Sequence, residues 1–182
     1  MPIFIKISFL KTLLTNQQIG LTIKRLAHQL LENHVQLANT VIIGLQPRGV
    51  FLSDRIVDEI KQSGEASNIA YGKLDITFYR DDVRKMIHMP NPMDIHFSVE
   101  DKNVVLIDDV LYTGRTIRAA LDALMDFGRP AKVELMVLID RRYSRQLPIQ
   151  ADYIGKSIDS IITQKVKVLW REKDEEDKVV LI

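Results

Sequence analysis

The sequence contains no cysteine and no long apolar run. Without cysteine the chain can form no disulfide and no thiolate metal site, and it has no cysteine nucleophile. This composition fits a reducing cytoplasm, which is where we expect the protein to reside. No apolar stretch approaches the roughly 18 residues that a membrane span needs. The N-terminal segment has lysines among its apolar residues and lacks a small-residue cleavage site, so we expect no signal peptide and no membrane partner.

A charge excess of either sign is also missing. The formal net charge is +1, so a nucleic-acid partner would have to meet a local basic patch. Hydrophobic residues make up 46% and charged residues 27%, which is an ordinary globular composition. The 182 residues fit a single domain, which we expect to extend over residues 1–182.

Short apolar runs alternate with amphipathic segments along the chain. The runs are rich in β-branched residues and predict strands buried on both faces, as in a parallel sheet. Between them, apolar residues recur at helical spacing. The predicted strands are 41–45, 104–107 and 135–139. Three helices are predicted: the first begins after a cap at Thr15, the second ends near Gly64, and the third ends at Gly128. This alternation predicts a doubly wound α/β sheet.

The remaining segments are less regular. Residues 74–79 alternate as an extra strand, and residues 165–170 and 179–182 also have strand character. Residues 81–100 lack periodicity, which in a compact domain is typical of a disordered or functional loop. The charged run 171–178 is more typical of a solvated turn than of a binding site.

Polar residues concentrate where the run at 104–107 ends. Gly114 permits a turn that exposes successive backbone N–H groups, and the helix that follows adds the partial positive charge of its N-terminus. Thr113 and Thr116 add hydroxyl donors. We therefore expect a site for one phosphate group, beyond the carboxyl end of a strand, where open α/β sheets bind ligands.

Asp108 and Asp109 would repel a phosphate and need another partner. A ribose diol offers two hydroxyl donors, which two carboxylates can accept, and a divalent cation is the other candidate. The predicted division is phosphate on the threonines and ribose on the aspartates. The plainer alternative is that Asp109 caps a turn and Gly114 ends a loop, because short motifs also occur by chance.

Residues 104–116, Val-Val-Leu-Ile-Asp-Asp-Val-Leu-Tyr-Thr-Gly-Arg-Thr, resemble the signature of phosphoribosyltransferases, which bind phosphoribosyl pyrophosphate (PRPP). Residues 75–82, 114–130 and 147–156 narrow the resemblance to the PyrR family, whose members are uracil phosphoribosyltransferases and RNA-binding attenuation proteins of the pyrimidine operon. The resemblance covers nearly the whole chain.

The resemblance implies a type I phosphoribosyltransferase fold, an α/β fold in which helices flank a central parallel sheet. Its core would lie at about 15–140, a flexible loop at about 81–100, and a small hood over the base at about 141–160. The segment from Asp140 to about Ser160 is irregular and polar in sequence, which fits the hood.

The implied reaction joins uracil to PRPP, giving UMP and pyrophosphate, with Mg2+ held by Asp108 and Asp109 mostly through substrate and water. The implied catalytic residues are Asp108, Asp109, Arg48 and Arg80, the two arginines serving as cations for the departing pyrophosphate. Implied to bind PRPP or nucleotide are Gln46, Pro47, Arg48, Gly49, Asp108, Asp109, Val110, Leu111, Tyr112, Thr113, Gly114, Arg115 and Thr116. Implied to bind uracil are Tyr153, Ile154 and Gly155, although a packing role suits Tyr153 equally well.

One departure affects the pyrophosphate loop. The family usually has Lys-Thr-Arg-Gly where this chain has Gln46-Pro47-Arg48-Gly49, so one cation is missing. A cis peptide bond before proline is cheaper by about 2 kcal/mol or more than before another residue. We therefore hypothesise that the bond between Gln46 and Pro47 is cis.

Family members also respond to UMP and regulate pyrimidine genes by binding mRNA, which causes transcription attenuation. The implied RNA-binding residues are Lys24, Arg25, His28, Arg145 and Lys156. Lys24 stands where the family usually has a hydroxyl, and Asn33 and Gln150 replace basic residues, which would weaken phosphate contacts. Two alternatives stay open: a uracil-salvage enzyme without RNA regulation, and an RNA-binding regulator with residual catalysis. UTP and a homodimer or larger homo-oligomer are further implied partners.

Overall fold

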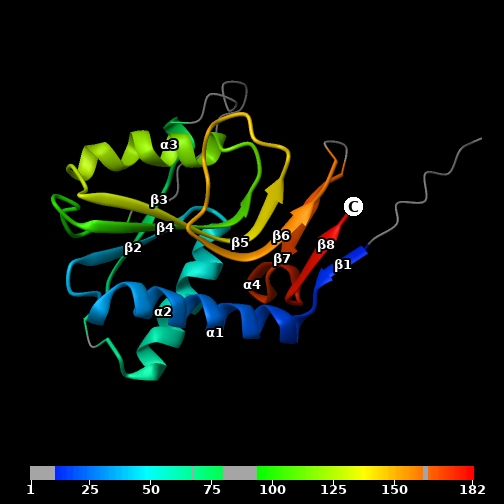
Figure 1. Cartoon of the computed structure of the whole chain (residues 1–182), viewed down its shortest axis with the longest axis horizontal. Helices are drawn as coiled ribbons and strands as arrows, with labels where there is room; N and C mark the ends of the chain where they lie inside the picture. The colour runs from blue at the N-terminus through cyan, green and yellow to red at the C-terminus, as the bar shows by residue number, and fades with distance from the viewer. Residues whose placement is uncertain (1–10, 67, 80–93, 162–163) are drawn as a thin grey trace, which may run out of the picture.

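The computed structural model describes residues 11–66, 68–79, 94–161 and 164–182. Its main sheet has five strands, all parallel, in the order β3-β2-β4-β5-β6 (Figure 1). These strands are β2 (Thr40–Leu45), β3 (Ala70–Leu74), β4 (Asn103–Leu111), β5 (Lys132–Arg142) and β6 (Tyr153–Asp159). From β2 the chain goes outward to β3 and then returns to β4 on the other side of β2. The carboxyl ends of β2 and β4 therefore form the switch point at which open sheets bind ligands.

Helices cover both faces of this sheet, as predicted. In Figure 1, α1 (Asn16–Asn33) and α2 (Gly49–Ser63) lie below the sheet, and α3 (Arg115–Leu124) lies above it. Thr15 and Gln18 form both hydrogen bonds of a capping box at the start of α1. Gly64 ends α2 in the left-handed conformation, with φ of 73°. Two short 3-10 helices, η1 (Val35–Leu37) and η3 (Met125–Phe127), follow α1 and α3.

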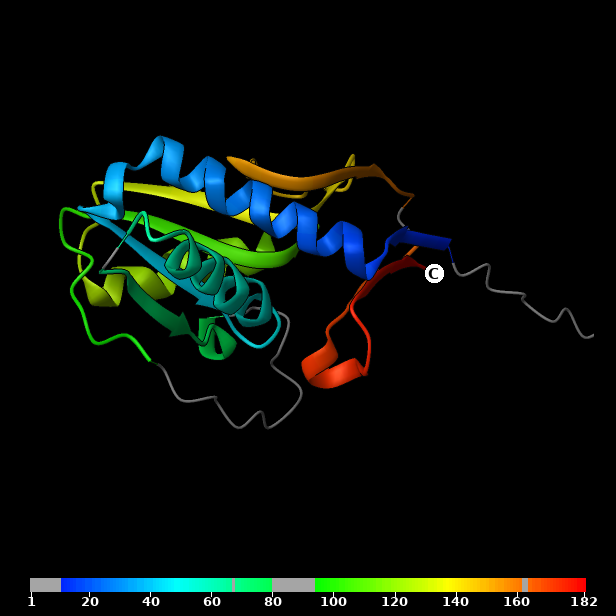
Figure 2. The same ribbon diagram turned by 90° about the horizontal axis from the view of Figure 1, so that it is seen from below.

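A second, antiparallel sheet joins the two ends of the described chain. Its strands are β1 (Lys11–Leu14), β8 (Lys178–Leu181) and β7 (Val166–Leu169), and α4 (Arg171–Asp174) connects β7 to β8. Figures 1 and 2 place this small sheet beside the N-terminal end of α1. Val168, Trp170 and Val179 are buried in the same apolar cluster as the inner faces of α1 and α2. The small sheet is thus packed onto the main core. No helix among the described residues is long and apolar enough to cross a membrane.

Two predictions about local structure were wrong. Residues 74–79 do not form a strand, because β3 ends at Leu74 and η2 (Thr77–Tyr79) follows. The Asp75 carboxylate accepts hydrogen bonds from the backbone N–H and the hydroxyl of Thr77, which turns the chain out of the strand. The predicted hood is not irregular throughout, since Tyr153–Asp159 forms β6 at the edge of the main sheet. Its Gly, Lys and Ser residues hide the apolar pattern of a strand.

Part of the predicted loop at 81–100 packs against the sheet. Asp94 pairs with Lys73 of β3 in an isolated bridge, and Val99 is fully buried beside the α3 face. The earlier part of this loop, with Arg80 beside it, lies outside the described residues.

Candidate active site

A cavity of about 400 Å³ opens where β4 ends and α3 begins. It is lined by Asp108, residues 110–117 and Gln146. Gly114 directly precedes α3 and has φ of 92°, a conformation that other residues rarely adopt. A Cβ atom at Gly114 would lie 3.2 Å from Cδ1 of Ile149. The structure therefore brings the predicted phosphate residues 110–116 together around one hollow at a helix N-terminus, where an anion is stabilised.

A turn at residues 145–149 supports this loop from outside. Gln146 donates its backbone N–H to the carbonyl of Thr113 at 3.0 Å, and its side chain accepts a 2.8 Å hydrogen bond from Nε of Arg115. Arg145 donates to the carbonyls of Leu111 and Tyr112 and pairs with the Asp140 carboxylate. Arg145 was predicted to bind RNA, but its guanidinium is used here to hold the cavity loop.

The two adjacent aspartates point to opposite faces of β4. Asp108 lines the cavity, and its Oδ1 accepts the backbone N–H of Asp109 at 2.9 Å. Asp109 faces the α2 side, where its Oδ2 accepts a hydrogen bond from Nε of Arg48 at 3.3 Å. Neighbouring side chains alternate along a strand, which places the two carboxylates on different faces of β4. Asp108 thus shares the cavity with the threonines and Asp109 pairs with Arg48, while their joint role in holding the ribose stays a prediction.

Asp109 depends on Arg48 for its charge. Burial raises the pKa of the Asp109 carboxyl above its usual value. The positive charge of Arg48 and its hydrogen bond lower that pKa, but burial remains the larger effect. Loss of Arg48 would leave a buried carboxylate without its cation, and the protonated form would then be favoured.

The loop at residues 46–49 lies beside β4 at the switch point. The Gln46–Pro47 peptide bond is cis, as hypothesised. A Cβ atom on Gly49 would lie 2.5 Å from the carbonyl oxygen of Ile107, so only glycine permits this close approach to β4. Arg48 is consequently held next to Asp109, at the end of the strand, as the sequence predicted.

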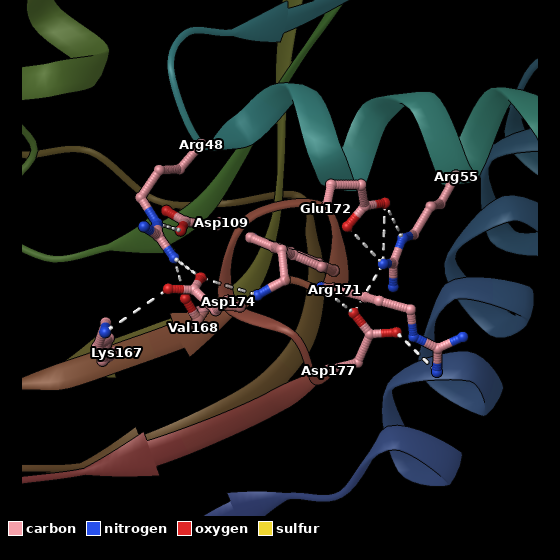
Figure 3. A network of polar contacts seen from close by, with 10 residues as sticks. Arg48, Arg55, Asp109, Lys167, Val168, Arg171, Glu172, Asp174 and Asp177 are labelled. Atoms are coloured by element: carbon pink, nitrogen blue, oxygen red, sulfur yellow. Dashed lines mark hydrogen bonds and ion pairs between the residues drawn. The ribbon is translucent and has the colours of Figure 1, made fainter.

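Arg48 is also bound by the C-terminal part of the chain (Figure 3). Its Nη2 donates to Oδ2 of Asp174 at 3.1 Å and to the carbonyl oxygen of Val168. Asp177, three residues further on, pairs instead with Arg55 of α2 at 2.7 Å. The charged run 171–178 is largely exposed, as predicted, but the carboxylates of Asp174 and Asp177 turn inward. These pairs join residues 126 and 122 positions apart, a separation at which local sequence patterns give no signal.

The residues predicted to bind uracil lie along β6 and α1. The Tyr153 side chain is buried, and its hydroxyl donates to Glu134 at 3.0 Å and accepts from Asn33 at 3.1 Å. The carbonyl groups of Ile154 and Gly155 accept hydrogen bonds from Arg25 of α1. The structure supports the packing role for Tyr153 and does not bring these three residues into the cavity.

The predicted RNA-binding residues come from α1, from β6 and from the segment after β5. Lys24, Arg25 and His28 are exposed on α1, and Lys156 of β6 donates to the carbonyl oxygen of Leu13 at 3.0 Å. Arg25 bonds to β6 beside Lys156, so the exposed parts of α1 and β6 meet. Arg145, by contrast, lies beside the phosphate loop.

Magnesium would find few protein ligands here. Within the described ranges no cluster of three or more metal-ligating side chains occurs. Mg2+ commonly keeps several waters and binds one or two carboxylates together with substrate phosphates. The single Asp108 carboxylate in the cavity fits that mode of binding.

Comparisons with known proteins agree with this geometry. Residues 10–173 match the model of the phosphoribosyl transferase domain family. A hypoxanthine phosphoribosyltransferase from Staphylococcus aureus superimposes with a TM-score of 0.67 at 22% identity, covering 93% of this chain and 90% of that one. The hypoxanthine phosphoribosyltransferase of Trypanosoma cruzi gives 0.68 at 18% identity, with 94% and 95% covered. At these identities the solved structures establish the fold alone. The sheet order, the cavity and the family match define a type I phosphoribosyltransferase.

Closer relatives narrow the assignment. A protein from Desulfosudis oleivorans called bifunctional protein PyrR is 50% identical over 171 residues, covering 92% of this chain and 93% of the relative. The protein of that name from Bacillus subtilis is 42% identical over 173 residues, with 93% and 94% covered. The chain belongs to the PyrR family of bifunctional phosphoribosyltransferases.

Proposed function

We propose that this phosphoribosyltransferase joins uracil to the ribose 5-phosphate of PRPP, forming UMP and releasing pyrophosphate. The observation that carries the proposal is the cavity at the switch point, in which one carboxylate, Asp108, faces the backbone and hydroxyl donors of residues 113–116. The 5-phosphate would bind those donors and the ribose hydroxyls would donate to Asp108. Membership of the PyrR family supports uracil as the acceptor base.

The reaction needs positioning and electrostatic stabilisation more than a protein nucleophile. The bond from the anomeric carbon to pyrophosphate breaks while the bond to the uracil nitrogen forms, and the carbon becomes cation-like between them. The proton of that uracil nitrogen passes to the released pyrophosphate or to water. Holding both reactants in line supplies much of the rate enhancement. Arg48 would stabilise the negative charge on the departing pyrophosphate, and Arg80 is a second predicted cation for it.

Mg2+ is part of the proposal. When bound, it neutralises phosphate charge and polarises the leaving pyrophosphate. Asp108 would hold it together with substrate oxygens and water, and Asp109 was predicted to contribute as well. Asp109 faces Arg48, so its contribution would be to the charge balance at the pyrophosphate side.

PRPP-dependent turnover across four bases tests this function. We expect the purified protein with Mg2+ to use uracil and to give little product with hypoxanthine, guanine or orotate. Turnover with a purine but not with uracil would support a phosphoribosyltransferase and refute uracil as its acceptor base. An inactive but folded protein with all four bases would refute the proposed transfer.

We propose a second function, UMP-responsive binding of pyrimidine-operon mRNA. The support is the bifunctional naming of the relatives and the exposed basic residues where α1 meets β6, with Lys24 and Lys156 on the two elements. A gel-shift titration of the upstream leader, with and without UMP, tests it. We expect UMP to tighten binding and salt to weaken it. Binding no tighter than to an unrelated hairpin would refute it, and sedimentation of the same sample would test the predicted homo-oligomer.

A further inference from the structure

We infer that Asp174 positions Arg48 for the departing pyrophosphate, which makes the C-terminal hairpin, β7, α4 and β8, a part of the active site. This inference rests on the proposed phosphoribosyl transfer, in which Arg48 meets the leaving group. Asp174 itself contacts no substrate in this account. It acts through the guanidinium that it holds (Figure 3).

The guanidinium of Arg48 is fixed on one side. Nε donates to Asp109, and Nη2 donates both to Asp174 and to the carbonyl oxygen of Val168. Two anchored nitrogens fix the plane of the group, because guanidinium is rigid. Nothing in the described part of the chain accepts a hydrogen bond from Nη1, so its two N–H donors remain for an anion.

Asp174 is a rigid anchor. Its Oδ2 also accepts the backbone N–H of Trp170 at 3.1 Å, and its side chain is only 16% exposed. The hairpin that carries it is tied to α2 a second time, since Arg55 pairs with Asp177 and its guanidinium carbon lies 4.7 Å from the Trp170 ring centre. A carboxylate held this firmly can orient an arginine at little entropic cost when substrate binds.

The ion pair between Asp174 and Arg48 is better explained as positioning Arg48 than as inhibiting substrate binding. An anion bound at Nη1 would leave the bonds of Nε and Nη2 in place, so no displacement of Asp174 is needed. Arg48 is also the sole cation in residues 46–49, so the charge that this loop offers to an anion depends on the placement of one side chain. Misplacing one catalytic group by about 1 Å can cost on the order of a hundredfold in rate.

The test compares Asp174→Asn with the matched control Asp177→Asn. Asparagine keeps an oxygen for the Trp170 N–H and removes the charge that holds Arg48, together with a longer, 3.7 Å pair to the exposed Lys167. We expect Asp174→Asn to lower kcat/KM for PRPP roughly 10- to 100-fold, the range typical for supporting residues, while KM for uracil stays unchanged. Asp177→Asn loosens the same hairpin at Arg55 but leaves every hydrogen bond of Arg48 in place, so it should lower kcat/KM for PRPP much less than Asp174→Asn does.

A double-mutant cycle with Arg48→Gln separates positioning from a general structural role. If Asp174 acts through Arg48, Asp174→Asn causes no further loss in the Arg48→Gln background. Unchanged or improved PRPP kinetics in Asp174→Asn would overturn the inference, and so would an equal loss in both backgrounds. Should Asp174→Asn not fold, Asp174→Glu keeps the charge one methylene further out, and wild-type kinetics in that variant would overturn it as well.

Measuring pyrophosphate binding tests this inference separately from the proposed transfer reaction. Titrating magnesium pyrophosphate calorimetrically needs no acceptor base, so it applies even if uracil is not used. We expect weaker binding to Asp174→Asn than to wild type and to Asp177→Asn. Equal pyrophosphate binding by wild type, Asp174→Asn and Asp177→Asn would overturn the role of Asp174. Absence of transfer activity in the wild-type protein would refute the proposed function instead.

Discussion

Polar side chains gather at both ends of the strands of the main sheet, which we call the amino edge and the carboxyl edge, but only the carboxyl edge has a cavity that a ligand can enter. At the amino edge, Glu134 accepts hydrogen bonds from Tyr153 and Lys132 and lies 2.6 Å from Nε2 of His34, whose other ring nitrogen bonds Thr40. At the carboxyl edge, Asp108 and the threonine loop surround a cavity of about 400 Å³. The first network is closed on itself, whereas the second borders a cavity that a ligand can enter.

The pKa values of the buried carboxyl groups at the two edges shift in opposite directions. Burial acts to raise the pKa of Glu134, but hydrogen bonds from Lys132, His34 and Tyr153 outweigh it, and the pKa is lowered. Burial also raises the pKa of the Tyr153 hydroxyl to about 12. At Asp109 burial prevails over Arg48 and the pKa is raised.

The largest effect is expected at the carboxyl edge. Asp108→Asn removes the carboxylate of the cavity while keeping its shape, so transfer should fall on the order of 10²- to 10³-fold. Steady-state turnover of PRPP and uracil measures this. The thermal midpoint should change little, because asparagine keeps an oxygen for the backbone N–H of Asp109. Wild-type turnover in this variant would refute the assignment of the cavity.

Replacing Arg48 should change both the rate and its pH dependence. Arg48→Gln removes one charged hydrogen bond to the leaving group, an expected loss of roughly 10- to 100-fold in kcat/KM for PRPP. It also removes the cation that lowers the pKa of Asp109, so that pKa rises further and the acid limb of the pH profile should move to higher pH. A profile that keeps its acid limb would show that Asp109 does not govern it.

Gly114→Ala should loosen the phosphate loop without destroying the fold. A left-handed alanine costs about 1–2 kcal/mol, and the new Cβ would lie close to Ile149. We expect KM for PRPP to rise by about tenfold, the equivalent of 1.4 kcal/mol. Gly20→Ala is the matched control, since nothing lies within 4 Å of its Cβ position and alanine favours the helix. Equal kinetics in the two variants would contradict the role of the loop.

A substitution at the amino edge should affect stability and leave activity unchanged. Glu134→Gln removes the charge that accepts hydrogen bonds from Tyr153 and from the exposed Lys132, and it should cost about 1.5 kcal/mol of unfolding free energy at neutral pH. Because the folded pKa of Glu134 is lowered, its charge stabilises the protein above the unfolded pKa, and this advantage is lost as pH falls through the folded value. Urea unfolding of wild type and variant at several pH values measures it. A drop in kcat with unchanged stability would contradict the comparison.

The sequence was informative wherever the signal is local. The apolar runs located β2, β4 and β5, the cap at Thr15 located the start of α1, and the residues at 110–116 located the cavity. These features depend on neighbours in the chain, so periodicity and turn chemistry reveal them. The cis bond at Pro47 was accessible for the same reason.

Features that depend on distant contacts were missed. Strand β6 has a polar pattern because it lies at an edge, and Gln146 looked like an ordinary polar residue until it was seen against Arg115. Asp174 was placed in a solvated turn because its partner, Arg48, lies 126 positions away. The alternation of a strand could have shown that Asp108 and Asp109 face opposite ways.

A crystal structure of the protein with PRPP and Mg2+ tests the central claim most directly, because it shows which edge of the sheet holds the ligand. The account predicts the 5-phosphate against the backbone N–H groups of residues 113–116, a ribose hydroxyl on Asp108, and the pyrophosphate beside Arg48. A 5-phosphate bound anywhere else, with the loop at 113–116 empty, would contradict it.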